Sequence, residues 1–260
     1  MAEYSLIKNT TLVPALKAFW LREFRVRFGS FRLGYAWAII EPLYQVMIFT
    51  VLHAVIRGPG HDLYGASPAV FMLYGVITWL AFQHAVGQAR GSIKGNRGLF
   101  GYRQIKPIDI TIVRVGIEFL IMTVAYFVLL FAAFWLGFAP QIPNFLLIGY
   151  YAFCLLVFTF GFGLMLEIGA ILSPNIKRLS DVLMRPLFFI SGLFFAIDMV
   201  PTQYWPYLLW NPLLHVNDLI RDAAISGYTS PASPLYVTCS ALVALFLGLA
   251  LYRRYQYRLY

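Results

Sequence analysis

Residues 68–89, PAVFMLYGVITWLAFQHAVGQA, contain no Lys, Arg, Asp or Glu and are predominantly apolar. The residues that follow, 90–106, RGSIKGNRGLFGYRQIK, carry five Lys and Arg side chains and no acid. A helix of about 20 apolar residues is long enough to cross the hydrocarbon core of a bilayer. This stretch therefore predicts a transmembrane helix that ends at a basic loop.

The same pattern recurs along the chain. We expect six membrane spans, at residues 34–56, 68–89, 108–138, 145–172, 179–200 and 235–252. Continuous apolar runs indicate helices, because strands of a membrane barrel alternate in polarity over about ten residues. Only 12% of the residues are charged, whereas soluble domains carry about a quarter. The sequence thus predicts an all-α polytopic membrane protein.

Nearly all of the 20 Lys and Arg residues fall on one side of the expected spans. The four clusters are Lys8, Lys17, Arg22, Arg25, Arg27 and Arg32; Arg90, Lys94, Arg97, Arg103, Lys106 and Arg114; Lys177, Arg178 and Arg185; and Arg253, Arg254 and Arg258. Cytoplasmic loops of membrane proteins carry such an excess, so we expect both termini in the cytoplasm. Basic residues that border apolar spans indicate contact with anionic lipid rather than nucleic acid.

Two stretches outside the spans have distinct patterns. Residues 12–31 alternate aromatic and basic side chains at helical spacing, which predicts an amphipathic helix in the membrane interface. We therefore divide the chain into a cytoplasmic N-terminal part, 1–33, and one transmembrane domain, 34–260. Residues 201–234 are too polar for a full span and contain Pro206 and Pro212. They predict re-entrant half-helices before the last span, with an extracellular loop as the alternative.

Motifs for catalysis or metal binding are missing from the sequence. It contains no phosphate-binding loop of the Gly-x-x-x-x-Gly-Lys-Ser/Thr type, and its four His residues are scattered. The two cysteines, Cys154 and Cys239, fall inside expected spans. We therefore expect no enzyme activity, metal or cofactor in this chain, and any energy source must be another protein or a gradient.

The basic loop after residue 89 carries apolar side chains between its charges. A short helix that docks on a cytoplasmic partner is one interpretation, and a solvated loop that only sets the topology is the other. The candidate docking residues are Ile93, Arg97, Leu99, Phe100 and Arg103.

Three acids, Glu41, Glu118 and Glu167, fall inside expected spans. A carboxylate in lipid costs several kcal/mol, so each should face other helices or a water-filled path. Glu118 follows Arg114 by four residues, and an internal ion pair would account for both. We expect these four residues to have structural, ionic roles.

Aromatic rings beside cations suit a sugar polymer that carries negative charge, because rings stack on sugars and cations bind carboxylates. The candidate substrate-binding residues are Arg25, Arg27, Arg32, Tyr35, Trp37, Tyr44, Lys177, Arg178, Arg185, Trp205 and Trp210. The alternative for each is packing, a place in the interfacial aromatic belt, or a role in topology.

Several short motifs resemble those of permeases of the ABC-2 exporter family. They are residues 22–30 (REFRVRFGS), 33–37 (LGYAW), Glu41-Pro42, Lys106-Pro107 after the basic loop, and 211–213 (NPL) with Arg221. Together they extend along the chain in the family's order. Within the family, the sequence is most similar to the permeases of group 2 capsular polysaccharide export.

The resemblance implies the permease subunit of an ATP-driven exporter that moves a lipid-linked acidic capsular polysaccharide from the cytoplasm to the periplasm. It implies a homodimer in a bacterial inner membrane, with six spans and re-entrant half-helices in each subunit. Two cytoplasmic ATPase subunits would bind ATP and Mg²⁺, and a periplasmic adaptor and an outer-membrane exporter are further expected partners.

Other functions stay open at this point. A permease of the same family for O-antigen, teichoic acid, or a small lipid or drug would share much of the pattern. A gradient-driven secondary transporter would need ion sites at mid-membrane and usually a repeated half, and neither is visible in the sequence. A non-transporting membrane scaffold would leave the three buried acids unexplained.

Overall fold

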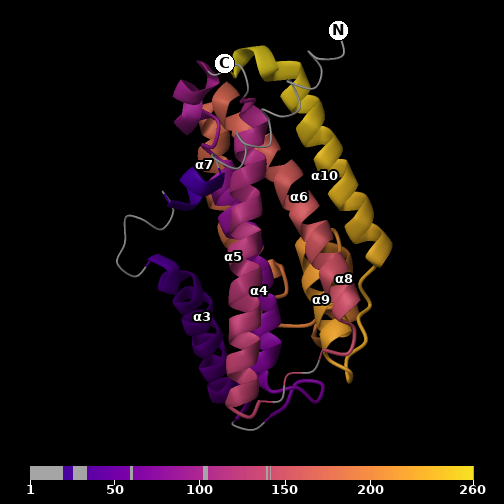
Figure 1. Ribbon diagram of the computed structural model, residues 1–260. Coiled ribbons are helices and arrows are strands. Elements are labelled where there is room, and N and C mark those ends of the chain that lie inside the picture. Colours follow the sequence, from indigo (N-terminus) through magenta and orange to yellow (C-terminus); the bar gives the residue numbers. More distant parts are fainter. Residues whose placement is uncertain are drawn as a thin grey trace, which may run out of the picture.

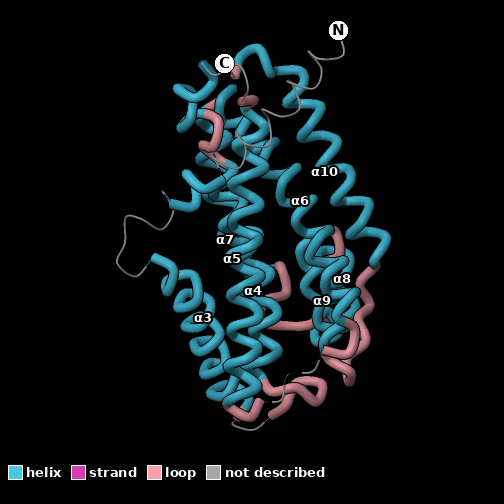
Figure 2. The backbone as a smooth tube through the Cα atoms, in the orientation of Figure 1, coloured by secondary structure: helices cyan, strands magenta, loops and turns pink. Residues whose placement is uncertain are grey.

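The computed structural model describes residues 20–25, 34–58, 61–101, 105–138, 140 and 142–259. In this part of the chain all helices and turns form one elongated bundle (Figures 1 and 2), and the only strand-like pairing is an isolated bridge between Leu63 and Ala66. The helices are α3 (Gly34–Arg57), α4 (Pro68–Ala89), η1 (Lys94–Gly101), α5 (Pro107–Trp135), α6 (Phe145–Leu172), α7 (Pro174–Ile190), η2 (Ile197–Met199), η3 (Thr202–Tyr204), α8 (Trp205–Leu208), α9 (Pro212–Ala224), α10 (Pro234–Tyr255) and η4 (Gln256–Arg258). The predicted all-α architecture is confirmed for these residues.

Five of the described helices, α3, α4, α5, α6 and α10, are long and apolar enough to cross a membrane. Their bounds lie within three residues of five expected spans. Large apolar side chains cover their outward faces, as shown by Val55 of α3, which is 77% exposed, and Phe246 of α10, which is 71% exposed. Such an outer surface suits contact with lipid rather than water.

The remaining expected span, 179–200, does not form one continuous helix. α7 ends at Ile190, and Gly192 then takes a left-handed φ of +73°, a conformation that glycine adopts without steric cost. Residues 191–196 are not helical, and only the short η2 follows. The predicted count of six spans is therefore not confirmed.

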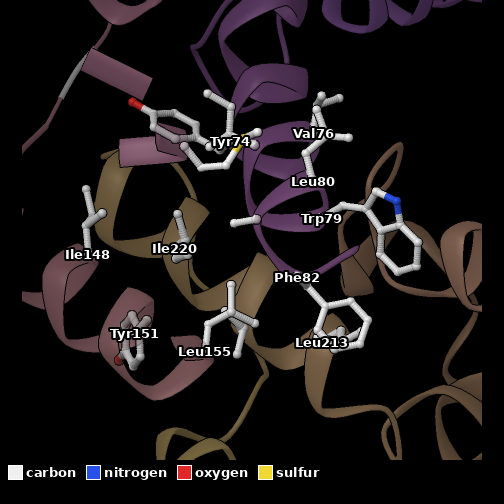
Figure 3. Close-up of a cluster of buried hydrophobic side chains, with 14 of the residues drawn as sticks. Tyr74, Val76, Trp79, Leu80, Phe82, Ile148, Tyr151, Leu155, Leu213 and Ile220 are labelled. Carbon is white, nitrogen blue, oxygen red and sulfur yellow. The ribbon is translucent and has the colours of Figure 1, made fainter. Parts of the chain in front are cut away.

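α4 is the central helix of the bundle. Every residue from Val70 to Phe82 is buried, and the helix contacts α3, α5, α6 and α9. Figure 3 shows part of this core, where side chains from α4, α6 and α9 gather. A helix that is buried on all sides carries few polar residues, which explains why its sequence is apolar around its whole circumference.

Small residues allow α6 and α10 to pack closely along their length. A Cβ atom on Gly161 would lie 2.4 Å from the Ala244 carbonyl group, and one on Gly248 would lie 2.6 Å from the Gly161 oxygen. Glycine at such contacts lets two backbones approach each other, as is common between membrane helices. α10 is thereby joined to α6 over a long contact.

A fully buried arginine explains why the chain leaves the helix after α7. Arg221 of α9 donates hydrogen bonds to the carbonyl oxygens of Gly192 (2.5 Å), Leu193 (2.7 Å), Phe195 (2.9 Å) and Phe71 (3.3 Å). Its guanidinium also lies 3.9 Å from the centre of the Phe71 ring. A buried charge is tolerated where it is hydrogen-bonded in this way. The non-helical carbonyl groups after α7 are satisfied by the same contacts.

Asp218, one turn earlier on α9, binds the neighbouring segments. Its carboxylate accepts hydrogen bonds from the Ile197 backbone N–H (3.1 Å), the Tyr228 hydroxyl (2.6 Å) and the Ser230 hydroxyl (2.5 Å). Asn217 donates to the Ser191 carbonyl oxygen at 2.6 Å. α9 therefore holds the segment after α7 and the segment before α10 together.

A further contact joins this region to the loop before α4. The Tyr64 hydroxyl donates to Asp198 Oδ1 at 2.6 Å. Burial, together with this hydrogen bond, raises the pKa of the Tyr64 phenol, so the group remains a protonated donor at neutral pH.

Replacing Arg221 with lysine should destabilise the fold although the charge is kept. A lysine ammonium has three donors at one point and cannot reach four carbonyl oxygens that match a planar fork. Because buried carbonyl groups would lose their partners, we expect a loss of about 2–4 kcal/mol. The measurement is the melting temperature in detergent, with the exposed Arg178→Lys as the matched control. Equal melting temperatures for the two variants would contradict this role of Arg221.

Candidate functional site

Basic side chains gather at one end of the bundle. α4, α6 and α10 end there, and α5 and α7 begin there (Figure 1). Their Lys and Arg residues are Arg90, Lys94, Arg97, Lys106, Lys177, Arg178, Arg253, Arg254 and Arg258. We call this the basic end. Arg57, at the last residue of α3, lies at the opposite end of the bundle.

Residues 90–101 follow α4 and lead toward α5, and the first of them bind a buried carboxylate of α6. We call these residues the basic segment. Glu167 is 1% exposed, and its carboxylate accepts the backbone N–H groups of Gly91, Ile93 (2.9 Å) and Lys94 (3.2 Å). A carboxylate is favourable here because the N–H groups of a first helical turn have no partner within the helix. We call this set of hydrogen bonds the α6 anchor.

The basic segment is also joined to α7 and α5. Arg90 Nη1 donates to Ser180 Oγ at 2.7 Å and forms an ion pair with Asp181, both on α7. We call these two interactions the α7 contact. Ser92 Oγ lies 2.8 Å from Thr111 Oγ1 of α5, so a hydrogen bond joins the two hydroxyl groups. The start of the segment thus contacts three helices, α5, α6 and α7.

Of the candidate docking residues, Arg97 is exposed and Phe100 is partly buried, so both are accessible at the basic end. Ile93 is fully buried, so it could support docking only indirectly, by holding the segment in place. The structure describes only the backbone of Leu99, and Arg103 lies outside the described residues.

A groove of about 510 Å³ lies between α3, α4 and α7, next to the α7 contact. We call it the cation–aromatic groove. Its lining residues are Gln45, Trp79, Gln83, Arg90, Asp181, Met184, Arg185, Phe188 and Phe189. Trp79 Nε1 donates to Gln83 Oε1 at 2.7 Å, which orients both side chains. Guanidinium groups, amides and aromatic rings around one groove can bind a polar ligand that carries negative charge.

A second polar cluster connects α3, α4 and α5. His84 Nε2 of α4 lies 3.2 Å from Glu41 Oε1 of α3, and His84 Nδ1 lies 4.0 Å from Glu118 Oε2 of α5. Both carboxylates thus face another helix, as expected for acids inside a membrane. The cluster shows how α3, which is otherwise little buried, is held against α4.

Arg114 of α5 forms an ion pair with Glu23, whose Oε1 atom lies 2.5 Å from its Nε atom. Glu23 belongs to residues 20–25, which are helical and are the described part of the expected interfacial helix. The pair between Arg114 and Glu118 stays a prediction. The ion pair with Glu23 instead shows that the chain before α3 contacts α5.

The candidate substrate-binding residues are spread over the molecule. Arg185 lies in the groove, and Lys177 and Arg178 are exposed near the start of α7. Trp37 and Tyr44 are exposed on α3, and Arg25 is exposed in the helical residues 20–25. Trp205 donates to the Val200 carbonyl oxygen at 2.9 Å and, with the exposed Trp210, lies around α8, away from the basic end. Arg27 and Arg32 lie outside the described residues, and only the backbone of Tyr35 is described.

Sequence reasoning missed most of the groove, including Trp79, Gln83 and Asp181. A signal was present, because Trp79 and Gln83 are four residues apart and share a helix face. On α7, Asp181 and Arg185 are also four residues apart and give the helix a polar face. Treating α7 as part of an ordinary membrane span hid this pattern.

Comparisons with known proteins agree over nearly the whole chain. The profile of a family described as ABC-2 type transporter matches residues 14–225. A polysialic acid transport protein KpsM of Escherichia coli is 40% identical over 92% of this chain and 92% of its own length. The capsule polysaccharide export inner-membrane protein CtrC of Neisseria meningitidis is 28% identical over 97% and 94%. The O-antigen export system permease protein RfbA of Klebsiella pneumoniae is 23% identical over 91% and 90%.

If the groove is filled with water, thiols placed in it should be reactive. We expect Gln83→Cys and Arg185→Cys to react with a membrane-impermeant maleimide, because a hydrated thiol ionises more readily than one in lipid. Leu242→Cys, on the exposed apolar face of α10, is the matched control and should stay unlabelled. Cys154 and Cys239 are first replaced with alanine, and labelling is read by gel shift in membrane vesicles of either orientation. Equal labelling of groove and control positions would contradict a hydrated groove.

Proposed function

Because the chain belongs to the ABC-2 type transporter family, we propose that it is the permease subunit of an ATP-driven exporter of capsular polysaccharide. The observation that carries this proposal is its similarity, over more than nine tenths of both chains, to proteins named for transport of polysialic acid and export of capsule polysaccharide. Five apolar helices around a packed core are consistent with a permease. The substrate we propose is an acidic polysaccharide linked to a lipid.

ATP hydrolysis would take place in a separate chain. The sequence has no phosphate-binding loop, so the permease would need two ATPase subunits that bind ATP and Mg²⁺ in the cytoplasm. The basic segment is the proposed docking site, because it is the cytoplasmic connection between α4 and α5 and exposes Arg97. The position of the basic end supports a cytoplasmic location for it and for both termini.

The proposed assembly is a homodimer in the inner membrane of a bacterium. The relative CtrC is named as an inner-membrane protein. α7 with residues 191–200 would form the sixth crossing, and α8 and α9 would be half-helices in the outer half of the bilayer. Their non-helical connections are shielded by protein, as Arg221 and Asp218 illustrate, which is the condition for irregular backbone at that depth.

The proposed substrate path includes the cation–aromatic groove. A second copy packed along α3 and α7 would enclose the groove, since α3 is exposed along much of its length. Lys177, Arg178 and Arg185 would bind carboxylates or phosphate of the glycolipid at the entrance. A periplasmic adaptor and an outer-membrane exporter would receive the chain on the other side.

Export of O-antigen is the second candidate. It rests on the similarity to RfbA, which is 23% identical, and so has less support than export of capsule. A strain with defined glycans can distinguish the two functions, because only one polymer would disappear from the surface when the gene is deleted.

Loss of cations from the groove entrance should reduce export. We expect the triple variant Lys177→Gln, Arg178→Gln, Arg185→Gln to export at least about tenfold less acidic polysaccharide, because hydrogen bonds to charged groups contribute more than neutral ones. The measurement is surface polysaccharide in a deletion strain that carries each variant, normalised to permease in the membrane. The control neutralises Arg253, Arg254 and Arg258 at the same end of the bundle and should export normally. Normal export by the first variant would reject the proposed path.

Shortening two apolar side chains in the outer part of the basic segment should weaken binding of the ATPase to the permease. We expect the double variant Leu99→Ala, Phe100→Ala to reach the membrane at normal levels but to lose most of the ATPase that co-purifies with it, because apolar side chains anchor protein interfaces. The matched control, Leu136→Ala with Phe138→Ala, changes the same residue types at the opposite end and should retain the ATPase. Undiminished co-purification and secretion by the first variant would show that the segment only sets topology.

A further inference from the structure

The α6 anchor differs from the other contacts of the basic segment because its partners are backbone groups. The buried Glu167 carboxylate accepts the N–H groups of Gly91, Ile93 and Lys94, and the hydrogen bond from Ile93 is itself buried. Loss of these hydrogen bonds would leave a buried carboxylate without partners, which is costly in the protein interior. The start of the segment therefore keeps its place relative to α6.

The anchored part of the segment is itself closed by internal contacts. Asn96 Nδ2 donates to the Ser92 carbonyl oxygen at 2.9 Å, and Ile93 is fully buried. The helical turns are interrupted at Asn96, whose φ and ψ of −121° and 20° are not helical. Residues 91–96 thus form an inner turn held by Glu167, and the exposed Arg97 begins an outer turn. A force on the outer turn reaches α6 through the inner one.

α6 in turn passes a displacement to other helices. It contacts α4, α7, α9 and α10. A Cβ atom on Gly163, one turn before Glu167, would lie 2.7 Å from Ala89 Cβ, which shows how closely α6 packs on the end of α4. Helices packed as closely as α6 and α4 move together rather than deform.

The α7 contact is built differently. Asp181 is 54% exposed, and exposed ion pairs contribute little to stability and separate readily. Arg90 and Asp181 both line the cation–aromatic groove. The contacts of the basic segment with α6 and α5 are therefore buried at Ile93 and Ser92, whereas its contact with α7 includes an exposed ion pair that is part of the groove wall.

We propose that Glu167 is a positioning residue of the export cycle, which keeps the basic segment fixed to α6 while the α7 contact opens and closes the groove. This inference rests on the proposed function, since the movement would be driven by ATP in a partner docked on the segment. α6 with the segment would move as one body. α7 would be released when Arg90 leaves Ser180 and Asp181.

The test uses the permease with its ATPase in lipid nanodiscs and the variant Glu167→Gln. The amide keeps the shape of the carboxylate but loses its charge and part of its accepting capacity. We expect faster hydrogen exchange at the amides of residues 91–94, normal complex assembly, and about three- to thirtyfold more ATP hydrolysed per polysaccharide exported. Thr159→Val is the matched control, because it removes a buried hydrogen bond to the Leu155 carbonyl oxygen within α6 without touching the segment.

Distances between spin labels test the movement without measuring export. After Cys154 and Cys239 are replaced, labels at Arg97→Cys and Leu172→Cys report the distance from the segment to α6. Labels at Arg97→Cys and Val182→Cys report the distance to α7. On addition of ATP we expect the first distance to stay constant and the second to change, whereas Glu167→Gln should make the first distance variable.

Each outcome supports or overturns the inference. Faster exchange in Glu167→Gln with an unchanged ratio of ATP to export would leave Glu167 a purely structural role. An ATP-dependent change in the distance to α6 in the unmodified protein would show that the anchor is not fixed. If the complex exported no acidic polysaccharide at all, the proposed function would be wrong. The two label distances would still show whether the basic segment stays fixed to α6. If Glu167→Gln does not assemble, Glu167→Asp, which keeps the charge on a shorter side chain, takes its place.

Discussion

The arrangement of the other helices depends on the hydrogen bonds that the Arg221 guanidinium donates. The guanidinium binds carbonyl oxygens of α4 and of the segment after α7 from its own position on α9. In an apolar environment these carbonyl groups would otherwise require a regular helix. Because Arg221 satisfies them, α7 can end at Ile190 and the chain can turn back through α8 and α9 (Figure 1). The shortness of α7 is thus a consequence of a residue some 30 positions further along the chain.

That early end has a consequence at the basic end. α7 carries a polar face with Ser180, Asp181 and Arg185, which would be unfavourable in a long helix surrounded by lipid. In the structure this face meets Arg90 and lines a groove. The segment after α7 is bound to α9 through Asn217 and Arg221, and the helix itself meets the basic segment through Ser180 and the exposed Asp181. The exposed ion pair is the part of these contacts that can separate most readily beside the groove.

The sequence predicted the long helices well, because an uninterrupted apolar run of sufficient length has few alternatives in a membrane. α4 and α6 begin and end at the residues expected from the pattern. The end of α7 could not be found this way, since residues 187–200 remain mostly apolar across the break, and its cause is a tertiary contact with Arg221. Local spacing proposed Arg114 as the partner of Glu118, and that pair stays a prediction. Spacing could not indicate the contacts of Glu118 with His84 and of Arg114 with Glu23, because they join different helices.

The candidate site was harder to predict than the helices for the same reason. Arg185 was recognised as a cation near the cytoplasmic side, but Trp79 and Gln83 belong to another helix and look like core residues in the sequence. The partners of Glu167 are backbone N–H groups, which leave no mark on residue types at all. The packing of α7 against α4 brings the groove residues together, and the packing of α6 against the basic segment brings Glu167 to its N–H partners.

The distribution of acids supports an anionic ligand on physical grounds. Among the described residues, Arg90 is paired with Asp181 and Arg114 with Glu23, and Glu41 and Glu118 face His84. Glu167 is occupied by backbone N–H groups. No ion pair in this part of the chain involves Arg185, Lys177 or Arg178. Among the described residues their positive charge is therefore not offset by an ion pair, and Arg185 lines a groove with aromatic walls together with Asp181. A neutral sugar would gain only hydrogen bonds from these cations, whereas a carboxylate or phosphate would also be attracted by their charge, most strongly where the groove excludes water.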